Sequence, residues 1–139
     1  MTELTQQDID NHCARLNISR ENLTEFVIPD GVTQIGSWAF SRCSALTSIT
    51  IPDGVTIIDW GAFGGCTSLT SITIHDSVTK ICNNALRRCT ALRQIICNHP
   101  DLFTNENIDN KFNKLHKFSV FINFVQIIAS VFLLVMYLK

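Results

Sequence analysis

Apolar residues recur along this chain with a fixed period of 23 residues. Leu23, Leu46, Leu69 and Leu92 each open a stretch in which apolar and polar positions follow in nearly the same order. A period between roughly 20 and 50 residues is typical of stacked repeats, because one unit cannot bury its apolar face alone. The spacing therefore predicts three consecutive units and the start of a fourth, stacked so that equivalent apolar residues form continuous rows.

The second unit, residues 46–68, shows the pattern most clearly. Its first six residues, LTSITI, have the spacing of a short strand with Thr50 facing outward. A Pro-Asp-Gly turn ends that strand, and the β-branched run at 55–58 predicts a second short extended segment. An Ala-Phe pair followed by Cys66 has the spacing of a single helical turn on the opposite wall.

The apolar positions of the units fit a known repeat pattern, roughly L-x-x-I-x-I-P-x-x-V-x-x-I-x-x-x-A-F-x-x-C-x-x. The second unit matches at Leu46, Ile49, Ile51, Pro52, Val55, Ile58, Ala62, Phe63 and Cys66. The first unit matches at Leu23, Phe26, Ile28, Pro29, Val32, Ile35, Ala39, Phe40 and Cys43, and the third departs at His75 and Leu86. This pattern resembles the BspA-type leucine-rich repeat over residues 23–97. The resemblance implies an α/β repeat solenoid of about three 23-residue units, and a protein that recognises other macromolecules.

Residues 1–22 are expected to form an N-terminal capping helix. Thr5 is placed to accept from first-turn amides, and Asp8, three residues later, suits the positive end of a helix. Ile9, Cys13 and Leu16 share one narrow apolar face. Because the terminal unit of a solenoid needs its apolar end covered, we expect this face to lie on the first repeat.

Three of the six cysteines, Cys43, Cys66 and Cys89, occupy the same position in successive units. An even number of cysteines is compatible with a disulfide framework, but such frameworks are typical of small secreted chains. The N-terminal sequence has no basic start and no apolar core, so no signal peptide is expected. Buried, reduced thiols are the favoured interpretation. No spacing of cysteine and histidine suggests a metal site.

No catalytic chemistry is indicated by the sequence. The four histidines have no partner arrangement, and nucleophile-elbow, zinc-protease and phosphate-loop motifs are absent from it. We therefore expect neither an enzyme nor a bound cofactor. Residues 23–97 balance five acidic against five basic side chains without a basic stripe, which argues against nucleic acid as a partner.

The surface of the solenoid remains as the candidate for binding a protein partner of unknown identity. Solenoid faces bind partners because stacking builds one broad surface from repeated positions. The candidates are the outward strand positions and two tryptophans that replace small or polar residues of other units: Val27, Thr50, Thr73, Arg93, Ile96, Trp38 and Trp60. Exposed tryptophan is enriched at binding hot spots. The equally weighted alternative is that each indole fills a local gap or packs on a neighbouring repeat.

After the repeats, a polar linker at 98–117 precedes 21 uncharged residues at 118–138. As a helix this segment would be about 30 Å long, which matches the hydrocarbon core of a membrane. Lys111, Lys114 and Lys117 precede it, and by the positive-inside tendency a single-pass tail anchor would leave the repeats in the cytosol. The alternative is a helix that caps the solenoid in a soluble protein.

Polar residues within 118–138 fall on one face of the expected helix. They are Ser119, Asn123, Gln126 and Ser130. Such stripes support association between helices in lipid, so a homo-oligomer through this segment is a further expectation.

Two classes of function fit these observations. The preferred one is a non-catalytic protein–protein interaction module, held at a membrane by 118–138. The alternative is a soluble or surface-displayed, adhesin-like repeat protein whose last helix caps the solenoid.

Overall fold

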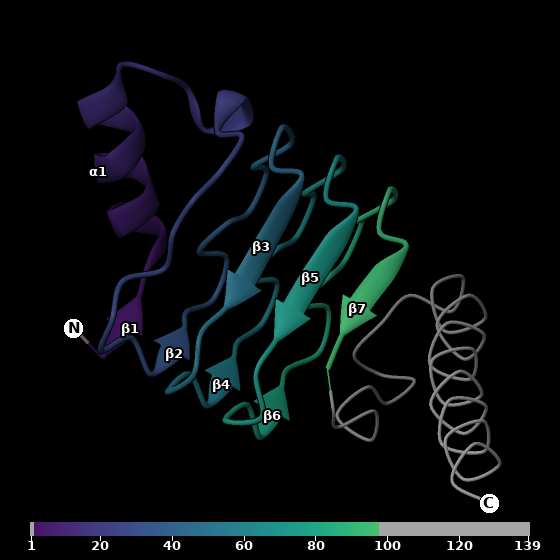
Figure 1. Ribbon diagram of the computed structural model, residues 1–139. Helices are drawn as coiled ribbons and strands as arrows, with labels where there is room; N and C mark the ends of the chain where they lie inside the picture. Colours follow the sequence, from purple (N-terminus) through teal and green to yellow (C-terminus); the bar gives the residue numbers. More distant parts are fainter. Residues whose placement is uncertain (1, 98–139) are drawn as a thin grey trace, which may run out of the picture.

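One wall of the fold is a three-stranded parallel sheet built from equivalent positions of successive units (Figure 1). In the computed structural model, which describes residues 2–97, it contains β3 (Ser48–Ile51), β5 (Ser71–Ile74) and β7 (Gln94–Ile96) in that order. Ser48 pairs with Ser71, and Ser71 with Gln94, so the register equals the sequence period. The side chains alternate between exposed or half-buried and buried positions, as the alternation of polar and apolar residues predicts.

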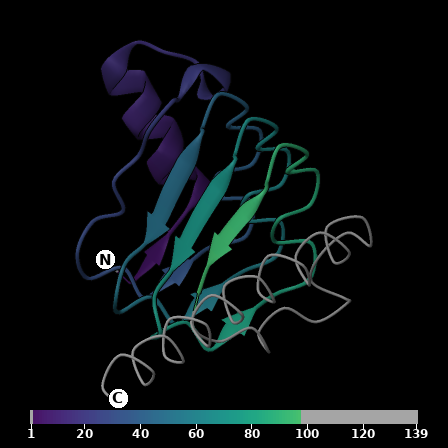
Figure 2. The ribbon, with the colours of Figure 1, turned by 45° about the vertical axis from the view of Figure 1, so that its right-hand side comes forward.

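A second parallel sheet consists of four two-residue strands: β1 (Glu3–Leu4), β2 (Gln34–Ile35), β4 (Ile57–Ile58) and β6 (Lys80–Ile81). Figure 2 shows it lying below the longer strands. The last three strands are the predicted β-branched segments of the units. The first strand was not predicted, because its two residues give no pattern by themselves and are paired only through β2.

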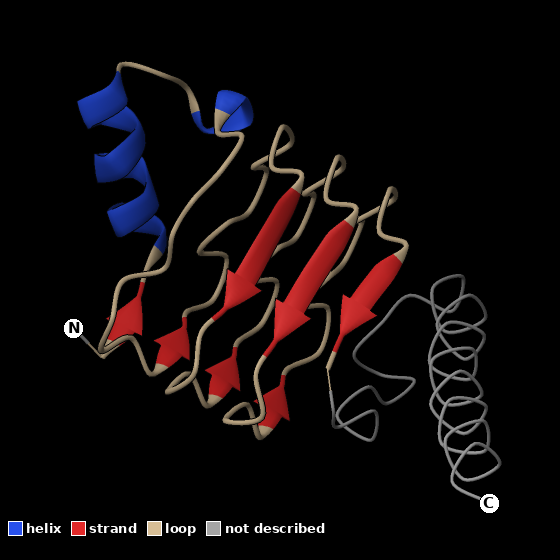
Figure 3. Ribbon diagram, in the orientation of Figure 1, coloured by secondary structure: helices blue, strands red, loops and turns tan. Residues whose placement is uncertain are grey.

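The third wall contains turns, where a helical turn was predicted (Figure 3). Its turns run through positions such as Trp38 and Arg42, whose backbone φ angles are 60° and 62°. Left-handed residues interrupt an α-helix, so this part of the prediction is wrong. The turns are joined between units instead: Phe40 N donates to Ala62 O at 2.7 Å, and Phe63 N donates to Ala85 O at 2.8 Å.

The apolar rows predicted from the period form the core between these walls. Leu23, Leu46 and Leu69 are all fully buried, as are Phe40 and Phe63. The two phenylalanine rings are stacked, with centroids 5.1 Å apart and an interplanar angle of 6°. Stacking of 23-residue units is therefore confirmed.

The first unit departs from the others before β2. Residues 23–29 form no strand, although Leu23 and Ile28 are buried as the pattern requires. Phe26 turns toward the N-terminal helix and Phe40, with its ring centroid 5.2 Å from that of Phe40. Consequently β3 is an edge strand of its sheet, and Val27 is not part of the sheet.

Helix α1 (Gln6–Leu16) precedes the first unit and is followed by the 3₁₀ helix η1 (Arg20–Asn22). Thr5 caps α1 in a reciprocal box with Asp8, as the sequence suggests. Ile9 and Cys13 join the core, but Leu16 is 54% exposed, so its predicted packing is wrong. Leu16 is the last residue of α1, and the left-handed backbone of the C-cap residue Asn17 ends the helix there.

Within the part of the chain that the structure describes, no helix has the length and apolar character needed to cross a membrane. The predicted linker at 98–117, the predicted membrane helix at 118–138 and its polar stripe (Ser119, Asn123, Gln126 and Ser130) lie outside the described residues.

Candidate recognition surfaces

The outward face of the β3-β5-β7 sheet collects three of the predicted partner-binding residues. Thr50, Thr73 and Ile96 are register partners and form one row across the sheet. Ile96 is 45% exposed at one end of that row. Arg93 is exposed just before β7, next to the same face. The period is sufficient to place these side chains together, because parallel register carries each position onto its equivalent in the next unit.

Val27 lies apart from that row. Its side chain is 87% exposed, and a hollow of about 380 Å³ separates its segment from β3, with Phe26, Ile28, Ser48 and Thr50 among its lining residues. The hollow exists because residues 23–29 do not pair with β3. The outward row predicted from the sequence is therefore formed only from the second unit onward, and it does not include Val27.

Trp38 and Trp60 lie in the segments that follow β2 and β4, outside the β3-β5-β7 sheet. Their rings meet edge to face, with centroids 4.6 Å apart at 87°. A Cβ atom at Gly61 would lie 2.6 Å from the Trp38 ring, and one at Gly64 would lie 3.0 Å from it. The half-buried Trp38 indole therefore covers glycines of the next unit, whereas Trp60 remains 41% exposed.

Asp59 fixes the start of the turn that carries Trp60. Its Oδ1 accepts a hydrogen bond from Trp60 N at 2.7 Å. Burial raises the pKa of Asp59, but the hydrogen bonds from Trp60, Ser37 and Cys82 outweigh it, and the pKa ends below its ordinary value. The carboxylate is thus ionised at neutral pH and acts as a local cap for the turn.

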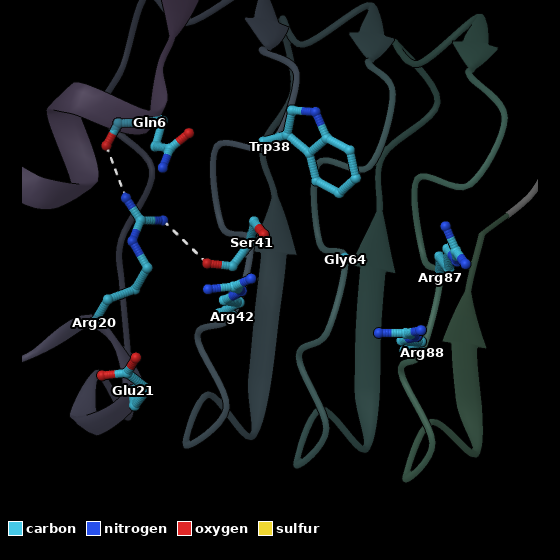
Figure 4. A pocket seen from close by; sticks show the side chains of 9 residues that line it. All are labelled: Gln6, Arg20, Glu21, Trp38, Ser41, Arg42, Gly64, Arg87 and Arg88. Atoms are coloured by element: carbon cyan, nitrogen blue, oxygen red, sulfur yellow. Dashed lines mark hydrogen bonds between the residues drawn. The ribbon is translucent and has the colours of Figure 1, made fainter.

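A hollow of about 660 Å³ lies on the wall of turns and was not anticipated from the sequence (Figure 4). Its lining includes Trp38, Ser41, Arg42, Gly64, Arg87 and Arg88. Gln6, Arg20 and Glu21 line it at the end nearest α1. One signal was available: arginine at residues 42 and 88 alternates with Gly65 at a single repeat position.

The cysteine row is buried in the core rather than placed at a reactive surface. All six cysteines are free, and Cys43, Cys66 and Cys89 are buried. Cys66 Sγ donates to Phe40 O at 3.1 Å, and Cys89 Sγ donates to Phe63 O at 3.2 Å. Burial raises the pKa of Cys43 to about 12. The neighbouring Cys89 thiol and burial raise the pKa of Cys66 as well. Such thiols stay protonated and are poor nucleophiles.

Within residues 2–97, no three histidine, cysteine, aspartate or glutamate side chains are grouped so that they could hold a metal ion.

Comparison with known proteins places the repeats in context. A crystal structure of a leucine-rich cell surface protein from Faecalibacterium prausnitzii is similar, with 41% sequence identity and a TM-score of 0.50. The similarity covers 51% of this chain but only 19% of that protein, so the chain spans a small part of its relative. No curated protein matches. The BspA type leucine-rich repeat region matches residues 17–137 in six copies, which extends beyond the repeats recognised from the sequence. The chain belongs to the BspA-type leucine-rich repeat family.

Proposed function

We propose that this chain is a non-catalytic recognition module that binds another protein through the outward face of β3, β5 and β7. The observation that carries the proposal is the register that aligns Thr50, Thr73 and Ile96 in one outward row, in which Thr50 and Ile96 are exposed and Thr73 is half-buried. Short hydroxyl side chains leave the sheet face even, and Ile96 adds an apolar contact at its end. The family and the cell surface relative support a repeat protein without enzymatic activity.

The area of this face limits the binding affinity that it can provide. Strands of four residues at about 3.3 Å per residue, spaced by about 4.8 Å, give a patch of roughly 13 by 10 Å. A stable protein–protein interface covers about 800 Å² on each partner. Binding by this face alone is therefore weak, and tethering or repetition of the module raises the effective concentration enough for use.

Attachment to a membrane through 118–138 is the second part of the proposal. The uncharged length of that segment supports it, and the cell surface relative is consistent with display at a membrane. The flanking lysines favour cytosolic repeats, whereas display like that of the relative requires repeats outside the cell.

Site-directed photo-crosslinking tests the recognition face. A crosslinking amino acid at Thr50 should capture a protein partner in cells, and excess purified repeats should compete the product away. The same amino acid at Lys80, an exposed residue of β6 in the other sheet, is the matched control. Thr73→Arg should reduce the Thr50 product at least about tenfold by placing a bulky charge in the row. Equal products at both positions, or products that resist competition, contradict the proposal.

Alkaline extraction of membranes tests the tether. The full chain should stay with the lipid, and a variant with three charged residues inside 118–138 should be released. Protease protection of the repeats then decides the side of the membrane on which they lie. Release of the unmodified chain at high pH contradicts the tether and leaves the recognition face untouched.

A further inference from the structure

Three arginines on the wall of turns have no acidic partner within the part of the chain that the structure describes. Arg42, Arg87 and Arg88 are exposed and line the 660 Å³ hollow, and no described side chain or carbonyl accepts from their guanidinium groups. Arg20, at the end of the same hollow, is different, because it pairs with Asp10. The charge of the other three is thus available to a ligand.

The repeat geometry spaces two of these arginines regularly. Arg42 and Arg88 hold the same position in the first and third units, and the second unit places Gly65 between them. Neighbouring units lie about 4.8 Å apart, so the two arginine backbones are separated by about 10 Å. Gly64, which lines the hollow between the two arginines, carries no side chain, so no side chain fills the space there (Figure 4).

The backbone at these positions favours glycine, yet arginine is present. Arg42 and Arg88 have φ angles of 62° and 60°, and Gly65 has 79° at the equivalent position. Left-handed backbone costs a non-glycine residue about 1 kcal/mol or more. Within the described residues, neither arginine side chain makes a hydrogen bond or an ion pair that would offset this cost. Strain of this kind is concentrated at functional sites.

We propose that this hollow binds an extended, acidic segment of a protein partner. Carboxylates on one face of an extended segment lie about 7 Å apart, and flexible arginine side chains separated by about 10 Å can each reach one. The planar guanidinium fork binds a carboxylate through two parallel hydrogen bonds. Trp38, at the edge of the hollow, presents its indole to the peptide backbone.

Other anionic partners fit less well. A nucleic acid backbone needs a longer basic track, whereas here Glu21 lines the same hollow. A membrane surface is flat on the scale of a side chain, so it does not enter a concavity between repeats. An acidic peptide is narrow enough to do so and carries discrete charges at the required spacing.

This site is independent of the proposed sheet face, because β3, β5 and β7 contribute none of its lining residues. The two surfaces are therefore tested separately: a partner bound by one wall leaves the other free.

Fluorescence anisotropy with the full chain tests the proposal. The probe is a labelled ten-residue peptide of alternating glutamate and serine, and a glutamine–serine peptide is the neutral control. The acidic peptide should bind with an affinity that falls as salt rises, and the neutral peptide should not bind. Arg42→Asn/Arg88→Asn keeps a residue type that tolerates left-handed backbone, so the fold should persist by circular dichroism. This variant should lose at least about tenfold in affinity, equivalent to about 1.4 kcal/mol.

A charge-matched variant and two competitors complete the experiment. Arg15→Gln/Lys80→Gln removes the same charge from exposed positions outside the hollow and should change affinity less than about twofold. Equal losses in both variants would show general charge attraction and overturn the site. It would also be overturned if the acidic peptide failed to bind at millimolar concentration. Preferential binding of single-stranded RNA, or of vesicles containing phosphatidylserine, through Arg42 and Arg88 would likewise reject a peptide ligand.

Discussion

Each unit of the solenoid needs left-handed backbone at two positions of its turn wall. The second unit uses Gly61 and Gly65, whereas the first uses Trp38 and Arg42, and the third places Arg88 at the later position. Glycine adopts this conformation without steric cost. Trp38, Arg42 and Arg88 adopt it at a steric cost: the Trp38 side chain covers the next unit, and the two arginine side chains line the hollow.

Gly61→Ala should destabilise the fold through two separable effects. The positive φ of 60° costs alanine about 1 kcal/mol, and its Cβ would meet the Trp38 ring at 2.6 Å. We expect a total loss of about 2–3 kcal/mol in urea unfolding. In a Trp38→Asn background only the backbone cost of about 1 kcal/mol should remain. Equal losses of unfolding free energy in both backgrounds would mean that the Trp38 ring moves aside from the new Cβ without an energetic cost.

Native-state alkylation should separate the cysteines by burial. Iodoacetamide reacts with the thiolate, so the half-buried Cys82 should be modified before Cys43 and Cys66. Burial raises the pKa of all three thiols, but Cys82 is the one with partial access to solvent. Mass spectrometry after brief labelling at about pH 8 measures the order, and labelling in urea is the control. Equal rates in the folded chain would contradict a buried thiol row.

At the scale of elements, the strands were predictable and the turn wall was not. Alternating residues in 48–51 and 71–74 encode a strand directly, and the period encodes its register. The turns at 38–42 depend on left-handed residues, which only Gly61 and Gly65 suggest in the sequence. The Ala-Phe-x-x-Cys spacing was read as a helical turn because it reports burial, and burial does not distinguish a helical turn from successive β-turns.

Arg20 joins the N-terminal helix to the first unit, and replacing it should be costly. Its guanidinium donates to Gln6 O at 2.9 Å and Ala39 O at 2.8 Å, and it pairs with Asp10. Arg20→Ala should lower the free energy of unfolding by about 2–4 kcal/mol. Arg20→Lys should recover little, because one ammonium group cannot reach all these acceptors. Arg15→Ala, at an exposed site on α1, should change stability by less than about 0.5 kcal/mol.

The capping box of α1 should make stability depend on acid. Hydrogen bonds from the Thr5 side chain and backbone hold the pKa of Asp8 below its ordinary value of 3.8. A depressed folded-state pKa adds stability above the unfolded pKa, and that stability is lost as pH falls through the folded value. The free energy of unfolding should therefore fall below about pH 4. Asp8→Asn should flatten this dependence, although Asp59, whose pKa is also lowered, retains part of it. An unchanged profile would contradict a role for Asp8.

At the scale of the molecule, the two candidate sites differ in how well they could be predicted from the sequence. The row of Thr50, Thr73 and Ile96 follows from the period alone, so it was predictable. The arginine hollow combines residues of all three units with α1 and η1, and its floor depends on glycine backbone. Its members are far apart in sequence and fall on turns whose geometry was predicted as helical. No pattern along the chain places them on one surface.

The three units should unfold together. Phe63 is fully buried between neighbouring units and stacks on Phe40, so Phe63→Ala should cost about 3–5 kcal/mol. Tryptophan fluorescence, from Trp38 and Trp60, and far-ultraviolet circular dichroism should shift to the same lower urea midpoint. Separate midpoints for the two signals would show that units or the N-terminal helix melt independently.

The backbone hydrogen bonds between turns of successive units run one way, from the amides of one unit to the carbonyls of the next, as Phe40 to Ala62 and Phe63 to Ala85 illustrate. The equivalent amide of the third unit, at Leu86, donates to no backbone carbonyl within residues 2–97. The stack therefore has a direction: its turns present free amide donors toward the following unit and carbonyl acceptors toward the preceding one. A further repeat unit can accept these hydrogen bonds only when it is added in the same orientation. Two copies that met through identical ends would place amide donors against amide donors.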